Sequence, residues 1–197
     1  MDKIRKYALI VIIFIILIVP MFLGYYWEYF FIREFDVYVV LILIFGFIIF
    51  FIMGKLIEIY AYNDNRIEVL KKQDIINAFI SKKNLVVIWI FFPIIMIIEE
   101  LIFRFYIIAI LINQVELKAL VAVFISSLVF SLFHIHTWFS YRSIRILLVN
   151  LIFPFLLGLY NGYIFLTMGI IPCVIIHYII VLNLYYNLYK RYFKNDT

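Results

Sequence analysis

The sequence is poor in the residues that build disulfides, metal-binding loops and irregular surface structure. Its single cysteine excludes an internal disulfide and any zinc site made from cysteine pairs. Only 15% of the 197 residues are charged, and four prolines and six glycines leave few breaks in a chain that is 68% hydrophobic. Soluble domains contain about half apolar residues. We therefore expect an all-α, polytopic membrane protein.

Long runs without charge divide the chain into membrane spans. Because a spanning helix needs about 20 apolar residues, the runs predict six transmembrane helices, near residues 7–27, 37–57, 85–112, 119–141, 146–167 and 171–190. The last two share one apolar run, which the turn-forming sequence TMGIIP interrupts. The first run follows MDKIRK without a small-residue cleavage site, so we expect a retained helix rather than a signal peptide.

The net charge of +5 does not indicate nucleic-acid binding once the charges are placed along the chain. With six spans and a cytoplasmic N-terminus, 14 of the 17 lysines and arginines fall in cytoplasmic segments. Only Arg33 and Lys118 lie on the opposite side, and Arg104 falls within a span. This asymmetry follows the positive-inside rule. It predicts a multi-pass cell-membrane protein with both termini in the cytoplasm.

Polar groups are distributed unevenly between two predicted parts of the chain. Residues 1–84 contain two apolar spans and a cytoplasmic connector, whereas residues 85–197 carry nearly all the polar groups within spans. In the connector, an apolar helical face opposes lysines and an aspartate, which is typical of an amphipathic helix on the anionic inner leaflet. The face comprises Ile67, Leu70, Ile75, Ile76 and Phe79.

The third span contains two adjacent carboxylates and an arginine in the sequence IIEELIFR. Charges are costly at this depth unless they are paired. Glu100 and Arg104 are four residues apart on one helical face, so we expect them to form an ion pair. Glu99 lies about 100° around the helix and has no partner in its own span. This pattern predicts one structural carboxylate and one working carboxylate.

Histidines supply the other proton-active groups. Ser127, Ser131 and His134 recur at helical spacing in the fourth span, which predicts a polar face on a wet cavity. His136 is nearer the cytoplasmic end and is assigned to the membrane interface. In the sixth span, His177 follows Cys173 by one turn on the same face.

Glu99, His134 and His177 therefore come from three different spans and can activate a water molecule if they share a cavity. Two mechanisms stay open. Glu99 can act as a general base beside a histidine, or the three residues can bind Zn²⁺ and lower the pKa of its water. No HExxH motif supports zinc, so a metal site depends on tertiary convergence alone.

The order of these motifs resembles the CPBP family of intramembrane proteases, which includes CAAX prenyl endopeptidases and bacteriocin-processing or self-immunity proteins. EELIFR matches an EExxxR pattern, FSLFH matches FxxxH, and His177 stands where a third motif is expected. The resemblance covers residues 85–190. Three motifs in order on successive spans are more specific than any one of them.

The resemblance implies a role for each residue. Glu99 and His134 would activate the attacking water, Glu100 and Arg104 would support the site, and His177 would stabilise the oxyanion. The implied cavity opens toward the cytoplasm and lateral lipid, and the implied partner is a lipidated or membrane-embedded peptide or protein. Family members are catalogued as metalloproteases, so the cofactor is Zn²⁺ or none.

One position departs from the family pattern. Val181 stands four residues after His177, where the resemblance places a polar residue that would be a second oxyanion donor. Asn161 or Asn150 in the fifth span can substitute for it. However, Gly158 and Gly162 flank Asn161 with small-residue spacing, which favours helix packing for that stretch.

The predicted depths of the site residues also differ. At about 1.5 Å per residue, Glu99 lies roughly 22 Å from the preceding basic loop, but His134 lies only roughly 12 Å from Arg142. Convergence therefore requires a bend near Pro93 or a strong tilt of the third span.

Two functions from different classes are consistent with these residues. The first is an intramembrane endopeptidase acting on a membrane-tethered substrate, for example a prenylated CAAX-type protein. The alternative is a non-catalytic scaffold or immunity factor of the same fold, which the valine at position 181 favours. A transporter using the same groups as a proton relay is a third option, but the sequence shows no repeated halves.

Overall fold

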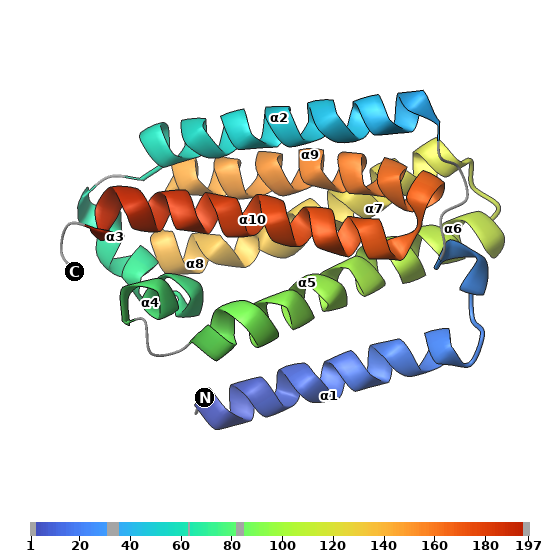
Figure 1. Ribbon diagram of the computed structural model, residues 1–197, viewed down its shortest axis with the longest axis horizontal. Helices are drawn as coiled ribbons and strands as arrows, with labels where there is room; N and C mark the ends of the chain where they lie inside the picture. Colours follow the sequence, from blue (N-terminus) through green and yellow to red (C-terminus); the bar gives the residue numbers. More distant parts are fainter. Residues whose placement is uncertain (1–2, 31–35, 63, 82–84, 195–197) are drawn as a thin grey trace.

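The protein is a bundle of helices that run roughly along its long axis (Figure 1). The computed structural model describes residues 3–30, 36–62, 64–81 and 85–194. Within these ranges the regular structure is helical throughout, and no strand occurs. This confirms the predicted all-α fold of a polytopic membrane protein.

Five helical segments of the described chain are long and apolar enough to cross a membrane, and they match five of the six predicted spans. Their elements are α1 (Lys3–Phe22), α2 (Val37–Tyr60), the consecutive α7 (Ala119–Phe133), η4 (His134–His136) and α8 (Thr137–Tyr141), then α9 (Ile144–Met168) and α10 (Ile170–Tyr192).

The other predicted span, 85–112, is helical without interruption but alternates between π- and α-helical turns. It contains η2 (Val87–Phe91), α5 (Phe92–Glu100), η3 (Leu101–Ile108) and α6 (Ala109–Asn113), of which η2 and η3 are π-helical. π-Turns inside α-helices occur frequently at functional sites. This span carries the two adjacent carboxylates.

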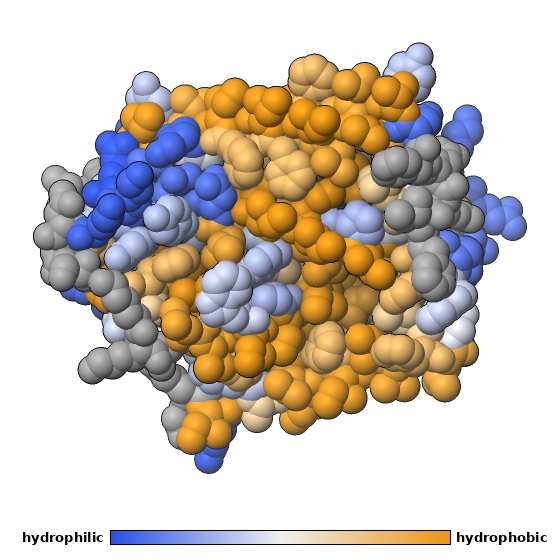
Figure 2. Space-filling model, viewed as in Figure 1, coloured by the Kyte–Doolittle hydropathy of each residue, from blue (hydrophilic) through white to orange (hydrophobic). Residues whose placement is uncertain are grey.

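The surface has the pattern that a bilayer requires. Figure 2 shows hydrophobic residues across the middle of the molecule and hydrophilic residues toward its two ends. Exposed apolar side chains of the spans include Ile16, Ile48, Phe124 and Ile175, each on a different span. A soluble protein would not expose so much apolar surface. The surface around the middle of the bundle is therefore the part that contacts lipid.

Both termini lie at the same end of the bundle (Figure 1). Near the N-terminus, Lys6 forms an ion pair with Asp74 at 2.5 Å. Near the C-terminus, the Tyr192 hydroxyl donates to the carbonyl of Tyr62 at 3.2 Å. This arrangement agrees with an even number of crossings. The cytoplasmic orientation stays a prediction, and Arg33, Lys82 and Lys83, which contribute to it, lie outside the described residues.

The connector differs from the predicted amphipathic helix on the membrane surface in two ways. It is divided into two helices, and protein covers its apolar face. The connector forms two short helices, α3 (Asp64–Lys71) and α4 (Asp74–Ser81). Leu70 and Ile76 are fully buried against Leu188 and Tyr189 of α10. The amphipathic pattern was therefore present, but its apolar face packs on protein rather than on lipid.

Helices α7 and α9 approach each other closely at Gly158. An added Cβ at Gly158 would lie 2.8 Å from the Ser127 Cβ and 2.9 Å from its Cα. Because one of these atoms belongs to the backbone, the neighbour cannot turn aside. The small-residue spacing in the fifth span thus serves helix packing, as the sequence predicted.

We expect Gly158→Ala to destabilise the protein by about 1–3 kcal/mol, the usual cost of overpacking. Gly54→Ala is the matched control, because its Cβ would make only an ordinary contact with Leu184 at 3.9 Å. Thermal unfolding of both variants in the same detergent measures the difference. Equal transition temperatures for the two variants would contradict the tight α7–α9 contact.

Candidate active site

Glu100 is the centre of a buried polar cluster. It is the last residue of α5, directly before the π-helical turns of η3, and its side chain is inaccessible to solvent. Its Oε2 lies 3.3 Å from Arg104 Nε, so the predicted ion pair is present. Its Oε1 accepts hydrogen bonds from Asn161 Nδ2 at 3.0 Å and from His177 Nδ1 at 2.7 Å. Three spans thus meet at one carboxylate.

The contact with Glu100 fixes the orientation of His177. An ionised carboxylate only accepts hydrogen bonds, so Nδ1 carries the hydrogen and donates it. The other ring nitrogen, Nε2, then faces Glu99 with 3.7 Å between it and Oε2. Glu99 has the partner that its own span lacks, and it comes from α10.

The charges of this cluster balance when His177 is protonated. Two carboxylates, Glu99 and Glu100, then face two cations, Arg104 and the imidazolium. A charge in an apolar interior is tolerated only when an opposite charge compensates it. The imidazole ring thus lies between two carboxylates, with Glu100 at Nδ1 and Glu99 at Nε2.

His134 lies where the fourth span changes from α-helix to the 3-10 turn η4. Its Nδ1 is 2.9 Å from the carbonyl oxygen of Phe130, so Nδ1 donates and Nε2 is left as the acceptor. The Phe130 ring contacts both histidines, with centroids 4.9 Å from His134 and 5.7 Å from His177. Arg104 stacks over the same ring at 4.2 Å. One phenylalanine thus connects the residues of three spans.

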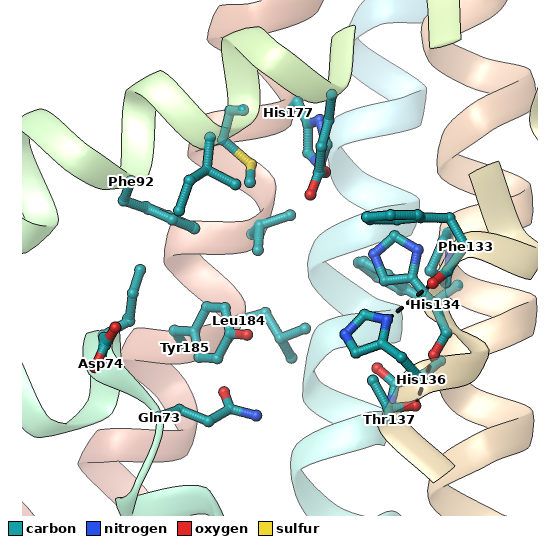
Figure 3. Close-up of a pocket in the computed structure, with 18 of the residues that line it drawn as sticks. Gln73, Asp74, Phe92, Phe133, His134, His136, Thr137, His177, Leu184 and Tyr185 are labelled. Atoms are coloured by element: carbon teal, nitrogen blue, oxygen red, sulfur yellow. Dashed lines mark hydrogen bonds and ion pairs between the residues drawn. The ribbon is translucent and has the colours of Figure 1, made fainter. Parts of the chain in front are cut away.

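Glu99, His134 and His177 all border one cavity of about 460 Å³. Figure 3 shows His177 and His134 on facing sides of it, with His136 below His134. Its walls include Phe92, Met96, Phe133 and Val181. α5 runs obliquely to α10 (Figure 1), and His134 sits at a break in its own helix. Residues predicted at different depths thereby face the same space.

The serine face does not belong to this cavity, contrary to expectation. The Ser127 hydroxyl donates to the carbonyl of Val123 at 2.6 Å, and that of Ser131 donates to the carbonyl of Leu151 at 2.7 Å. Both serines are buried, and neither lines the cavity. Small residues at helical spacing serve packing here, because they allow α9 to approach α7 closely.

A zinc site does not fit the described residues. No group of three histidine, cysteine, aspartate or glutamate side chains among them converges closely enough to hold a metal ion. Moreover, Nδ1 of each site histidine is already committed, in His134 to a carbonyl and in His177 to Glu100. The mechanism proposed below therefore uses these side chains and no metal ion.

Asn161 belongs to the buried polar cluster, a role that its sequence context did not indicate. It is fully buried, and its Nδ2 donates to Glu100 and also lies 3.4 Å from the carbonyl of Cys173. It does not line the cavity, so it cannot serve as the substitute oxyanion donor. Asn150 does line the cavity, with Nδ2 2.9 Å from the carbonyl of Ile146. Cys173 is buried away from the cavity, beside Asn161.

A family model described as type II CAAX prenyl endopeptidase Rce1-like matches residues 81–182. The match covers just over half of the chain and includes Glu99, Glu100, Arg104, His134 and His177. A search of curated proteins and a search of solved structures found no match.

Proposed function

The chain belongs to the family of type II CAAX prenyl endopeptidase Rce1-like proteins, and from this premise we propose that it is an intramembrane endopeptidase acting on a lipidated or membrane-embedded substrate. The observation that carries the proposal is the shared cavity of Glu99, His134 and His177, three proton-active groups from three spans. A scaffold would have no need of these groups around one space.

The chemistry is general-base hydrolysis. Glu99 takes a proton from a water molecule in the cavity, with Nε2 of His134 as the second acceptor facing that space. The water oxygen forms a bond to the scissile carbonyl carbon. His177 Nε2–H donates to the resulting oxyanion while Nδ1–H stays on Glu100. The C–N bond then breaks, and the proton held by Glu99 passes to the leaving amine.

Glu100, Arg104 and Asn161 are positioning residues in this mechanism. Glu100 lies behind His177, on the side away from Glu99, and is held by Arg104 and Asn161. None of these three side chains lines the cavity. They orient the imidazole, whereas Glu99, His134 and His177 face the substrate.

The proposal is tested with purified protein in liposomes and a farnesylated reporter peptide that ends in a CAAX sequence. We expect release of the peptide C-terminal to the farnesylated cysteine, and the same rate with a zinc chelator present. Failure of correctly folded protein to release any peptide would favour the non-catalytic scaffold. Loss of the release on addition of chelator would restore the metal-dependent mechanism.

Val181 offers a separate test of the oxyanion role. It lines the cavity one helical turn after His177 and places an apolar side chain where an amide could donate. One oxyanion donor is worth about 10²–10³ in kcat at other sites. We expect Val181→Asn to raise kcat by about tenfold or more, with little change in KM. Val181→Ala, which adds no donor, is the control, and an equal gain in both variants would contradict the prediction.

A further inference from the structure

The cavity has a polar end on the side away from His177 (Figure 3). Besides apolar walls, it is lined by Lys72, Gln73, Asp74 and Lys6, which come from the connector and α1, and by Tyr185 of α10. Figure 3 shows Gln73 and Tyr185 together on the side away from His177. These groups take no part in the hydrolysis described above.

We propose that this end of the cavity binds the free C-terminal carboxylate of the substrate, with Lys72 as its cationic partner. The proposal rests on the proposed endopeptidase function. A CAAX sequence has three residues after the lipidated cysteine, so cleavage there leaves a tripeptide whose own carboxylate is the end of the protein. That carboxylate is the one fixed charge on the leaving segment.

The spacing of two cavity-lining residues on α10 matches the length of that segment. Tyr185 follows His177 by eight residues on α10, which is about 12 Å along the helix axis. Three extended residues span about 10 Å. A tripeptide that begins at the oxyanion position beside His177 therefore ends near Tyr185 and Gln73.

Among the described residues that line this end, Lys72 is a cation without an ion-pair partner. Lys6 and Asp74 form an ion pair with each other at 2.5 Å. Lys72 lines the cavity, and its side chain makes no hydrogen bond or ion pair with the described residues. It is exposed, as a group must be if it meets a carboxylate at the mouth of an apolar cavity without the cost of full desolvation.

Gln73 supplies a hydrogen-bond acceptor for the peptide backbone. Its Nε2 donates to the Tyr141 hydroxyl at 2.6 Å, which fixes the amide. Its Oε1 is buried and has no hydrogen-bond partner within the described part of the chain. An unpaired buried acceptor is unfavourable, and a backbone N–H of the substrate would satisfy it. The Tyr185 hydroxyl, which also makes no hydrogen bond with the described residues, can donate to a substrate carbonyl.

An anionic phospholipid headgroup could also pair with Lys72, so the experiment distinguishes the peptide carboxylate from the lipid headgroup. Two farnesylated CAAX peptides are compared, one with a free C-terminal carboxylate and one with a C-terminal amide. Their Kd values are measured in nanodiscs of neutral lipid and of anionic lipid, using the Glu99→Gln protein so that bound peptide is not cleaved. Lys72→Gln is made in that background, and Lys71→Gln, an exposed neighbour that does not line the cavity, is the control.

We expect the carboxylate peptide to bind about fivefold more tightly than the amide, the effect of one partly exposed ion pair. Lys72→Gln should abolish this preference, and Lys71→Gln should keep it. Equal Kd values for the two peptides in neutral nanodiscs would overturn the proposal, as would a preference that survives Lys72→Gln. A Lys72 effect of equal size on both peptides, confined to anionic nanodiscs, would assign the lysine to lipid.

Because binding is measured without turnover, the result does not depend on catalysis. Carboxylate preference without peptide release by the wild type would contradict the endopeptidase and keep the binding site. Peptide release without carboxylate preference would support the endopeptidase and contradict the carboxylate-binding site.

Discussion

Replacing Glu99 with glutamine is expected to lower kcat for peptide release by about 10²–10⁴, the usual contribution of a general base. Glutamine has nearly the same shape but cannot take a proton from water. Glu99 is also the only carboxylate among the described residues that lines the cavity beside the two histidines, since Asp74 lies at the polar end and is paired with Lys6. The rate is measured with the farnesylated reporter in liposomes.

Glu58→Gln is the matched control for this substitution. Glu58 is also a largely buried glutamate, but it lies on α2, is bonded to Lys55 at 2.7 Å, and does not line the cavity. We expect the kcat of the Glu58→Gln protein to stay within about twofold of the wild-type value, because Glu58 lies outside the site. If His134 and Glu99 act on the same water, His134→Ala should cost little more in the Glu99→Gln protein than Glu99→Gln alone. Fully additive losses would place the two residues in separate steps.

Replacing Arg104 with methionine is expected to destabilise the protein by about 3–5 kcal/mol, because it leaves the buried carboxylate of Glu100 without its cation. Arg104 is 1% exposed and Glu100 is fully buried. Arg191→Met is the control, since that arginine is more than a third exposed and lies 3.9 Å from Glu58, and such pairs contribute at most about 1 kcal/mol. Thermal unfolding in nanodiscs measures both.

The double variant Arg104→Met with Glu100→Gln separates stability from activity. Removing both charges should restore most of the stability, because neither partner is then buried as an unpaired ion. Activity should stay low, because the imidazole of His177 loses the carboxylate that orients it. Recovery of activity together with stability would show that the cluster serves the fold alone.

Features that depend on one helix could be predicted from the sequence. The Glu100–Arg104 pair follows from a four-residue spacing, and the spans follow from the lengths of the apolar runs. The motif order of Glu99, His134 and His177 indicated the family that the match to residues 81–182 confirms.

Features that depend on contacts between helices could not be predicted in the same way. A buried asparagine and a small-residue packing motif look alike in a sequence, so the bond from Asn161 to Glu100 was visible only in three dimensions. An amphipathic face does not say whether protein or lipid covers it, and the connector packs on α10. The π-helical turns beside Glu100 also have no sequence pattern that distinguishes them from α-helix.

The central claim is that this chain hydrolyses a peptide bond through Glu99. The most direct measurement is the mass spectrum of a farnesylated CAAX peptide after incubation with wild-type protein and with Glu99→Gln protein in liposomes. We predict that the wild type yields a farnesylated product shortened by the three residues after the cysteine, while the Glu99→Gln sample keeps the intact mass. An intact peptide in both samples, or the same shortened product in both, would contradict the claim.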